Sequence, residues 1–207
     1  MCNLYNLTRA VDAMRNVFGP QPLDISASNG APTADIYPNL TAVVVRGGDG
    51  GYATENARFG LPTPPTYLVG KKVDRGVTNV RNTRSAHWRQ WLGPEHRCLV
   101  PFDRFAEPSG EGGNVWFELV PPTQGFFAGI IVRDWTSVRK VKDGPTTDTL
   151  FAFLTTEPNS VVGEFHPKAM PVILTERDEW DMWLTAPWAL ASTLQRPLRD
   201  DLIRVVG

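Results

Sequence analysis

Short apolar runs, separated by segments rich in glycine, proline and asparagine, make up most of the pattern along this chain. The runs are rich in β-branched and aromatic residues, a composition typical of strands rather than helices. We therefore expect strands at six positions: 41–46, 98–102, 115–120, 126–132, 150–155 and 171–175. The weaker patterns predict a further extended segment at 57–61 and turns with a short strand at 195–206.

Helical spacing of apolar residues is confined to three short segments. They are 10–18, 85–92 and 176–184, with Thr8 and Thr175 as the expected N-terminal caps of the first and third. Helices do not alternate with strands as they do in parallel βαβ folds. The pattern therefore predicts an α+β fold: a single domain over residues 1–207, with mainly antiparallel, curled or barrel-like sheets and a few short helices.

The composition is that of a globular domain. Of the 207 residues, 42% are hydrophobic, yet no apolar run reaches the ~18 residues that a membrane helix needs. The first residues lack the basic and apolar regions of a secretory signal. We therefore expect a cytoplasmic protein with reduced cysteines and no membrane partner.

Charge is balanced overall but uneven along the chain. The formal net charge of −1 excludes binding to a polyanion through the charge of the whole molecule. Two stretches are nevertheless basic: Lys71, Lys72, Arg75, Arg81, Arg84, Arg89 and Arg97 in the first, and Arg133, Arg139, Lys140 and Lys142 in the second. They fit either solvated faces or two edges that follow a phosphate backbone.

Cys2 is the first candidate for chemistry. Because chain ends usually lie at the surface, it is either an incidental exposed thiol or a functional one. If Met1 is removed, Cys2 presents a free α-amine beside its thiol, which places two nucleophiles on one residue. The other cysteine, Cys98, begins an apolar strand and is expected to be buried and unreactive. With His96 it supplies only two possible zinc ligands, so no metal site is expected.

Four further positions carry side chains suited to a site, although each also fits an ordinary structural role. Glu107 ends an apolar segment, where burial would raise its pKa and suit it to proton donation. His166 lies in a loop constrained by two prolines. Asn79 and Arg81 would share one face of an extended segment and could hold a phosphate or a sugar.

Taken together, these segments resemble the SRAP family, the SOS response-associated peptidases that are also called abasic-site processing proteins. The resemblance extends from Met1 to about Leu174 and rests on the order and spacing of five elements: Cys2, TNVRN, RCLVPFDRFAEP, FLTTEPNS and HPKAMPVIL. It implies the SRAP fold and a sensor of abasic sites in single-stranded DNA. By this resemblance, Cys2 forms a covalent thiazolidine crosslink with the damaged sugar after loss of Met1. No cofactor and no obligate protein partner are implied, and a monomer that associates with the nucleoid is expected.

The resemblance also implies individual roles. The catalytic residues would be Cys2 as nucleophile, Asn79 at the sugar, Glu107 near the α-amine and His166 assisting opening of the sugar ring. The DNA contacts would be Arg81, Asn79, Lys71, Lys72 and Thr155.

Three positions depart from the family pattern. Asn3 and Leu4 stand where many members have Gly-Arg, so a basic residue beside the site is missing. Pro108 replaces an aromatic residue after the glutamate. The tryptophan-rich wedge of the family is reduced to residues 59–62 (FGLP), so we expect weaker base stacking there, or stacking by other residues.

Two other functions remain open from the sequence. An N-terminal cysteine that uses its own amine as base is also the nucleophile of some amidohydrolases and peptidases. A non-covalent DNA-binding module with an incidental Cys2 is the other possibility. Cleavage of amide substrates without DNA crosslinking would favour the first, and the absence of a covalent band on a denaturing gel would favour the second.

Overall fold

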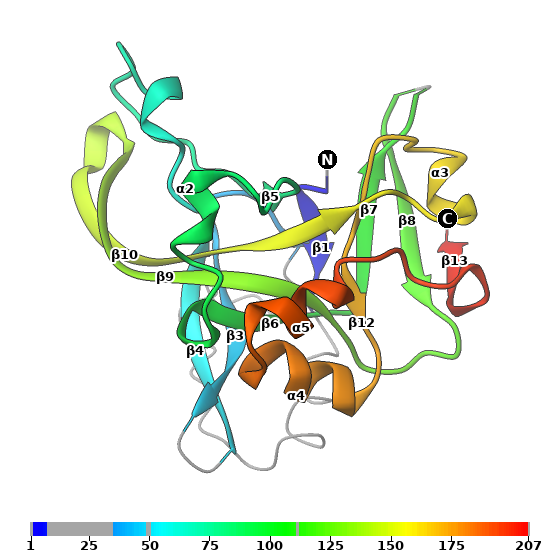
Figure 1. The fold of residues 1–207 in the computed structure, drawn as a ribbon. Coiled ribbons are helices and arrows are strands. Elements are labelled where there is room, and N and C mark those ends of the chain that lie inside the picture. Colours follow the sequence, from blue (N-terminus) through cyan, green and yellow to red (C-terminus); the bar gives the residue numbers. More distant parts are fainter. Residues whose placement is uncertain (1, 8–34, 49–50, 111, 207) are drawn as a thin grey trace.

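A closed barrel of five strands forms the centre of the molecule in the computed structural model, which describes residues 2–7, 35–48, 51–110 and 112–206 (Figure 1). The barrel strands are β3 (Thr41–Gly48), β4 (Gly51–Phe59), β6 (Arg97–Phe102), β9 (Gly125–Lys140) and β10 (Gly144–Thr156). Neighbours run antiparallel, except that β4 and β10 pair in parallel where the barrel closes. The predicted α+β fold with antiparallel, barrel-like sheets is confirmed, and the parallel seam is an addition to it.

A second antiparallel sheet packs beside the barrel. Its strands, in order, are β13 (Ile203–Val206), β8 (Asn114–Leu119), β7 (Arg104–Pro108), β1 (Leu4–Asn6) and β2 (Asp35–Ile36). Only Asp103 separates β7 from the barrel strand β6, so the chain passes directly from one sheet to the other. This short connection brings the N-terminal strand against the barrel.

Aromatic side chains join the two sheets into one core. Tyr5 of β1 makes edge-on contacts with Phe59, Phe127 and Phe153 of the barrel, at centroid separations of 5.8–6.3 Å. Such edge-to-face pairs are favoured because the positive ring edge meets the negative ring face. These aromatic contacts therefore hold the N-terminal strand β1 against the barrel.

Short elements complete the fold. They are β5 (Asn79–Val80), β11 (Met170–Pro171), β12 (Ile173–Leu174), α2 (Ala86–Arg89), α3 (Ser160–Gly163), α4 (Arg177–Thr185), α5 (Trp188–Ala191), and the 3₁₀ turns η1 (Pro65–Tyr67), η2 (Pro94–His96), η3 (Val141–Asp143), η4 (Ser192–Leu194) and η5 (Asp200–Leu202). None of the helices in the described ranges is long and apolar enough to cross a membrane.

The predicted helices have different outcomes. The one expected at 85–92 is present but shortened, and the one at 176–184 is α4. Its cap is Glu176 rather than Thr175, because Glu176 and Glu179 form a reciprocal capping box. The segment 10–18 lies outside the described residues.

Strands β9 and β10 continue past the barrel as a two-stranded arm over about 133–148, visible at the left of Figure 1. The predicted strands at 126–132 and 150–155 cover only the part inside the barrel. In the arm the side chains are mostly polar and partly exposed, so the apolar run that marks a buried strand is absent. The backbone ladder of the arm therefore continues without an apolar face.

Buried Arg97 connects the barrel to the C-terminal end of α4. Its guanidinium donates hydrogen bonds to the carbonyl oxygens of Leu92, Trp183 and Ala186, at 3.0, 2.6 and 2.6 Å.

We expect Arg97→Met to lower the free energy of unfolding by about 3 kcal/mol, because three carbonyls in the interior lose a charged donor. Urea unfolding measures this loss. Arg89→Met, on the exposed side of α2, is the control, and an equal effect in both variants would contradict the assignment.

Candidate active site

Cys2 is completely buried, with 0% of its surface exposed in the full-length chain. The expectation of an exposed terminal thiol is therefore wrong. The physical reason is that β1 begins two residues later and is an inner strand of the second sheet, between β2 and β7. The thiol lies beside the carboxyl group of Glu107, and its sulfur is 3.8 Å from the carbonyl oxygen of Leu4.

Glu107 lies on β7, next to β1, and is also 0% exposed. Burial raises its pKa to about 7, because the carboxylate loses its hydration. Burial, and after it the charge of Glu107, raises the pKa of the Cys2 thiol well above its usual value. Both groups therefore hold a proton more strongly than they would in water.

His166 approaches the same carboxyl group from the other side of the site. Its Nδ1 lies 3.5 Å from Glu107 Oε2 and 2.8 Å from the carbonyl oxygen of Ala169. A carbonyl only accepts, so Nδ1 carries the hydrogen, and Nε2 is the acceptor nitrogen of the neutral ring. The backbone N–H of His166 also bonds to Val162 O at 2.8 Å, which attaches the residue to the end of α3.

Asn79 reaches the site from β5, which pairs with β10. Its side-chain NH₂ donates to the carbonyl oxygen of Cys2 at 2.9 Å and contacts Thr78 Oγ1 at 2.8 Å and Asn3 Oδ1 at 3.2 Å. The amide oxygen Oδ1 is buried with no hydrogen-bond partner. A buried acceptor without a donor is costly, so this oxygen is suited to bind a hydroxyl group.

The four predicted catalytic residues thus converge. Cys2 and Glu107 come from adjacent strands of the second sheet, Asn79 comes from a strand added to the barrel, and His166 comes from the loop after α3. These residues are up to 164 positions apart in the sequence, and the join between the two sheets brings them together. The arrangement brings together a thiol, a carboxyl group with a raised pKa, an imidazole and an unsatisfied acceptor.

Comparison with known proteins identifies the family of the chain. The profile of the SOS response associated peptidase (SRAP) family matches residues 1–205. The chain belongs to the SRAP family. Membership associates it with the SOS response and with DNA damage. No curated protein matches the chain in sequence.

Solved structures share the SRAP chain's fold at low sequence identity. A protein from Bordetella bronchiseptica is 23% identical with a TM-score of 0.69, over 99% of this chain and 98% of that one. A protein from Bacteroides thetaiotaomicron is 17% identical with a TM-score of 0.71, over 99% and 90%. A phage-related protein from Bordetella bronchiseptica is 18% identical with a TM-score of 0.69, over 99% and 93%.

The predicted DNA contacts of this SRAP chain differ in exposure. Arg81 is exposed and donates to Lys168 O at 3.3 Å and Glu157 Oε2 at 3.4 Å, beside the site. Thr155 is only 2% exposed, and its carbonyl accepts a bond from Gln195, which also holds Arg81 O. A side chain this buried offers DNA almost no surface, so Thr155 fits a positioning role better than a contact.

Only some residues of the two basic stretches are exposed and free to contact DNA. Lys71 and Lys72 are exposed. Arg133 is paired with Glu55 at 2.8 Å, and Arg139 is buried and donates to the carbonyl oxygen of Gly60 at 2.8 Å. The second stretch therefore does not present a continuous basic edge.

Residues 59–62 offer DNA little stacking surface, in agreement with the expectation of weaker base stacking there, or of stacking by other residues. Phe59 and Leu61 are both 0% exposed and belong to the core. The exposed aromatic side chain of this region is Tyr67, which is 67% exposed on η1, four residues before Lys71. An isolated tyrosine in a proline-rich segment carries no periodic signal, so the sequence does not indicate this residue.

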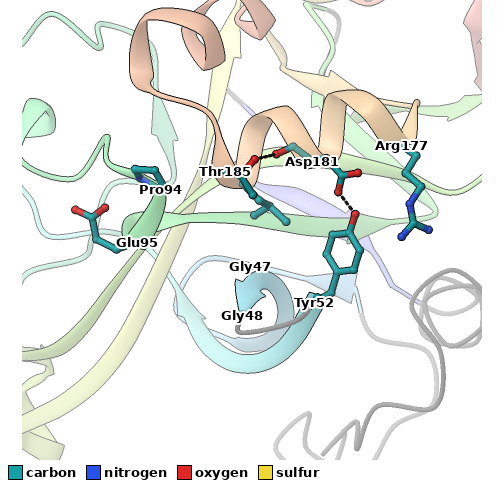
Figure 2. Close-up of a pocket in the computed structure, with 10 residues that line it drawn as sticks. Gly47, Gly48, Tyr52, Pro94, Glu95, Arg177, Asp181 and Thr185 are labelled. Atoms are coloured by element: carbon teal, nitrogen blue, oxygen red, sulfur yellow. Dashed lines mark hydrogen bonds between the residues drawn. The ribbon is translucent and has the colours of Figure 1, made fainter.

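A cavity of about 590 Å³ lies away from these residues, between the β3–β4 hairpin and α4 (Figure 2). There Tyr52 points its hydroxyl at Asp181, to which it donates a hydrogen bond, and Arg177 lies over the Tyr52 ring. None of the predicted site residues lines it. Within the described ranges, no group of three or more His, Cys, Asp or Glu side chains is placed to hold a metal ion.

Proposed function

We propose that this SRAP chain captures abasic sites in single-stranded DNA as a covalent thiazolidine on Cys2, and so protects the damaged site. The observation that carries the proposal is the position of Glu107. Its carboxyl group lies beside the Cys2 thiol and 3.5 Å from His166 Nδ1, while Asn79 holds the Cys2 carbonyl at 2.9 Å. One buried carboxyl group is therefore close to both the Cys2 thiol and the His166 imidazole.

Removal of Met1 is the first requirement, because Met1 occupies the amine that must react. The freed α-amine has a reference pKa near 8, so a useful fraction is neutral at physiological pH, which is not the case for a lysine near 10.4. The open form of an abasic sugar carries an aldehyde. The amine adds to the aldehyde carbon and gives a carbinolamine, which loses water to become an imine.

The thiol closes the ring in the next step. The Cys2 sulfur adds to the imine carbon, its proton goes to Glu107, and the nitrogen receives a proton in return, so that the only group lost overall is one water. Burial raises the pKa of the thiol, so the sulfur needs a base that takes its proton when it adds to the imine. Both nucleophiles belong to one residue, so the closure is intramolecular and strongly favoured.

Glu107 and His166 are suited to the proton transfers. A carboxyl group with a pKa of about 7 is present in both forms at neutral pH, so it can donate a proton to the departing water and then accept one from the thiol. The imidazole of His166 can accept a proton through Nε2 when the closed sugar opens. The unsatisfied Asn79 Oδ1 would accept a hydrogen bond from a sugar hydroxyl.

DNA would reach the site along the exposed side of the first basic stretch. Arg81, Lys71 and Lys72 supply positive charge for the phosphates, and Tyr67 offers an exposed ring on which a base can stack. Single-stranded DNA is the expected substrate, because an unpaired sugar enters a buried site without the cost of opening a duplex.

The direct test is intact-mass spectrometry of the purified protein before and after incubation with a single-stranded oligonucleotide that has one abasic site. We expect a species that lacks Met1 and equals protein plus oligonucleotide less one water, and no such species with undamaged DNA. Incubation with peptide and amide substrates runs in parallel. Amide cleavage without an adduct would reject the proposal in favour of an N-terminal-nucleophile hydrolase.

A further inference from the structure

A second cavity, of about 390 Å³, opens beside the first basic stretch. Its walls come from the segment around η1, from α2 and from the arm that β9 and β10 extend beyond the barrel. The lining residues are Thr63, Pro65, Leu68, Lys71, Lys72, Val73, Asp74, His87, Gln90, Trp91, Trp135, Thr136, Ser137 and Val138. This volume is in the range of small-ligand sites in proteins.

Two tryptophans form the aromatic part of the cavity. Trp91 and Trp135 meet edge to face with ring centroids 5.8 Å apart, and His87 makes a similar contact with Trp91 at 5.1 Å. Trp91 is almost buried, whereas Trp135 is 36% exposed on the arm. A large aromatic ring left exposed on a polar arm offers a flat surface that a planar ligand can cover.

The cavity is also positively charged. Lys71 and Lys72 are exposed at its edge, and neither makes an ion pair with a described residue. Asp74 is the acidic residue among the described lining positions, but it is buried, and its carboxylate already accepts bonds from Thr63 and from the Gly76 N–H. The charge available to a ligand is therefore that of the two lysines.

A buried hydroxyl group provides an independent sign of a polar ligand. Ser137 lines the cavity, and its Oγ is buried with no hydrogen-bond partner. A hydroxyl in this situation forgoes the hydrogen bonds it would have in water, a cost that a ligand with ring nitrogens or exocyclic oxygens would remove. The neighbouring Thr136 hydroxyl is already paired, with Thr147 at 2.8 Å.

We propose that this cavity binds a nucleotide of the same DNA strand, with the base stacked on Trp135 and its phosphate held by Lys71 and Lys72. The proposal rests on the proposed function and names the part of the substrate that lies beyond the damaged sugar. Val73 in the cavity and Asn79 in the active site are six positions apart in the sequence, so the two are at most about 22 Å apart in space. Single-stranded DNA commonly contacts a protein over about 4–16 nucleotides, which is enough to span this interval.

The test compares short and long single-stranded oligonucleotides on Trp135→Ala. We expect binding of an undamaged 16-mer to weaken about tenfold, while binding of a dinucleotide changes little, because two nucleotides are too few to occupy the active site and the cavity together. Trp135→Phe, which keeps a ring for stacking, should retain most of the affinity for the 16-mer. Equal losses on both lengths, or no loss on the 16-mer, would overturn the proposal.

Two further measurements keep the result separate from the active-site chemistry. Lys71→Ala with Lys72→Ala should reduce the salt dependence of 16-mer binding by about 1.4 in log–log slope, more than Lys140→Ala with Lys142→Ala, which lie outside the cavity. Crosslinking of an abasic dinucleotide should be unchanged in Trp135→Ala. If crosslinking is absent from the wild type as well, the proposed function fails, while the length dependence on undamaged DNA still decides the subsite.

Discussion

Replacing Cys2 with alanine should reduce the crosslink that survives denaturation at least ~100-fold, because ring closure depends on an intramolecular sulfur that alanine lacks. Alanine is also small, so Met1 is still removed and the α-amine remains. The variant should therefore form an imine that hydrolyses unless it is reduced. The measurement is the fraction of abasic oligonucleotide shifted on a denaturing gel, with and without borohydride.

The second cysteine provides the matched control. Cys98 is also a buried thiol without a disulfide, but it lies in barrel strand β6 and not in the candidate site. Cys98→Ala should crosslink as the wild type does. A normal yield of stable adduct from Cys2→Ala, without borohydride, would remove Cys2 from the mechanism. Loss of non-covalent DNA binding in that variant would instead point to a damaged fold.

The burial of Cys2 gives this prediction more weight than the sequence could. A terminal thiol that was only incidental would be expected at the surface, where neighbouring residues place no constraint on it. Here it lies at the end of an inner strand, beside a buried glutamate, with Asn79 bonded to its carbonyl oxygen. Two buried polar side chains, Glu107 and His166, therefore meet near this chain end, and the free-energy cost of burying them suits a reaction centre.

The barrel strands could be predicted because they are buried on an apolar face. The runs at 41–46 and 98–102 are almost continuously apolar, and both became barrel strands. Strands β1, β5 and β7 were missed. The first two span only three and two residues, and β7 carries Arg104 and Glu107, so none of them produces a periodic signal.

The candidate site depended on those missed strands. Composition and spacing identified Glu107, Asn79 and His166 separately, but each fitted an ordinary structural role, and only the resemblance to the SRAP family grouped them. Their meeting requires β1 to pair with β7 and β5 to pair with β10, which are contacts between distant parts of the chain. Local sequence does not encode such long-range pairings, and Trp135 was missed for the same reason.

Charge patterning proved the least reliable guide. Arg97 and Arg139 belong to the two basic stretches, yet both are buried and donate to backbone carbonyls. A guanidinium can satisfy several carbonyl oxygens at once, which makes arginine suitable inside a protein as well as against phosphate. Sequence alone does not distinguish an arginine that is buried in the protein from one that contacts phosphate. Lys71 and Lys72 of the first stretch, by contrast, are exposed.

Replacing Glu107 with glutamine should slow crosslinking by about 100-fold, within the usual contribution of general acid–base catalysis. Glutamine keeps the shape of the side chain but can neither release nor accept the proton. Below the pKa of about 7, Glu107 can donate but cannot receive the thiol proton; above it the reverse holds. The wild-type rate should therefore change its pH dependence near pH 7, and the variant should lose this inflection. Rates measured from pH 5.5 to 8.5 on an abasic oligonucleotide test this.

Glu107→Gln should slow the reaction but stabilise the fold at high pH, and this difference separates a catalytic role of Glu107 from a structural one. The folded-state pKa of Glu107 is raised, so the folded protein binds more protons than the unfolded chain between about pH 4.5 and 7. Wild-type stability therefore falls as pH rises through this interval, because the carboxylate must ionise inside the protein. Glu107→Gln removes this cost, so its Tm relative to wild type should be higher at pH 8 than at pH 5.

The control is the exposed Glu164→Gln, which should leave both the rate profile and the Tm profile unchanged. A Glu107→Gln variant that crosslinks normally, with the wild-type pH dependence of Tm, would show that the carboxyl group neither titrates in the site nor moves protons there.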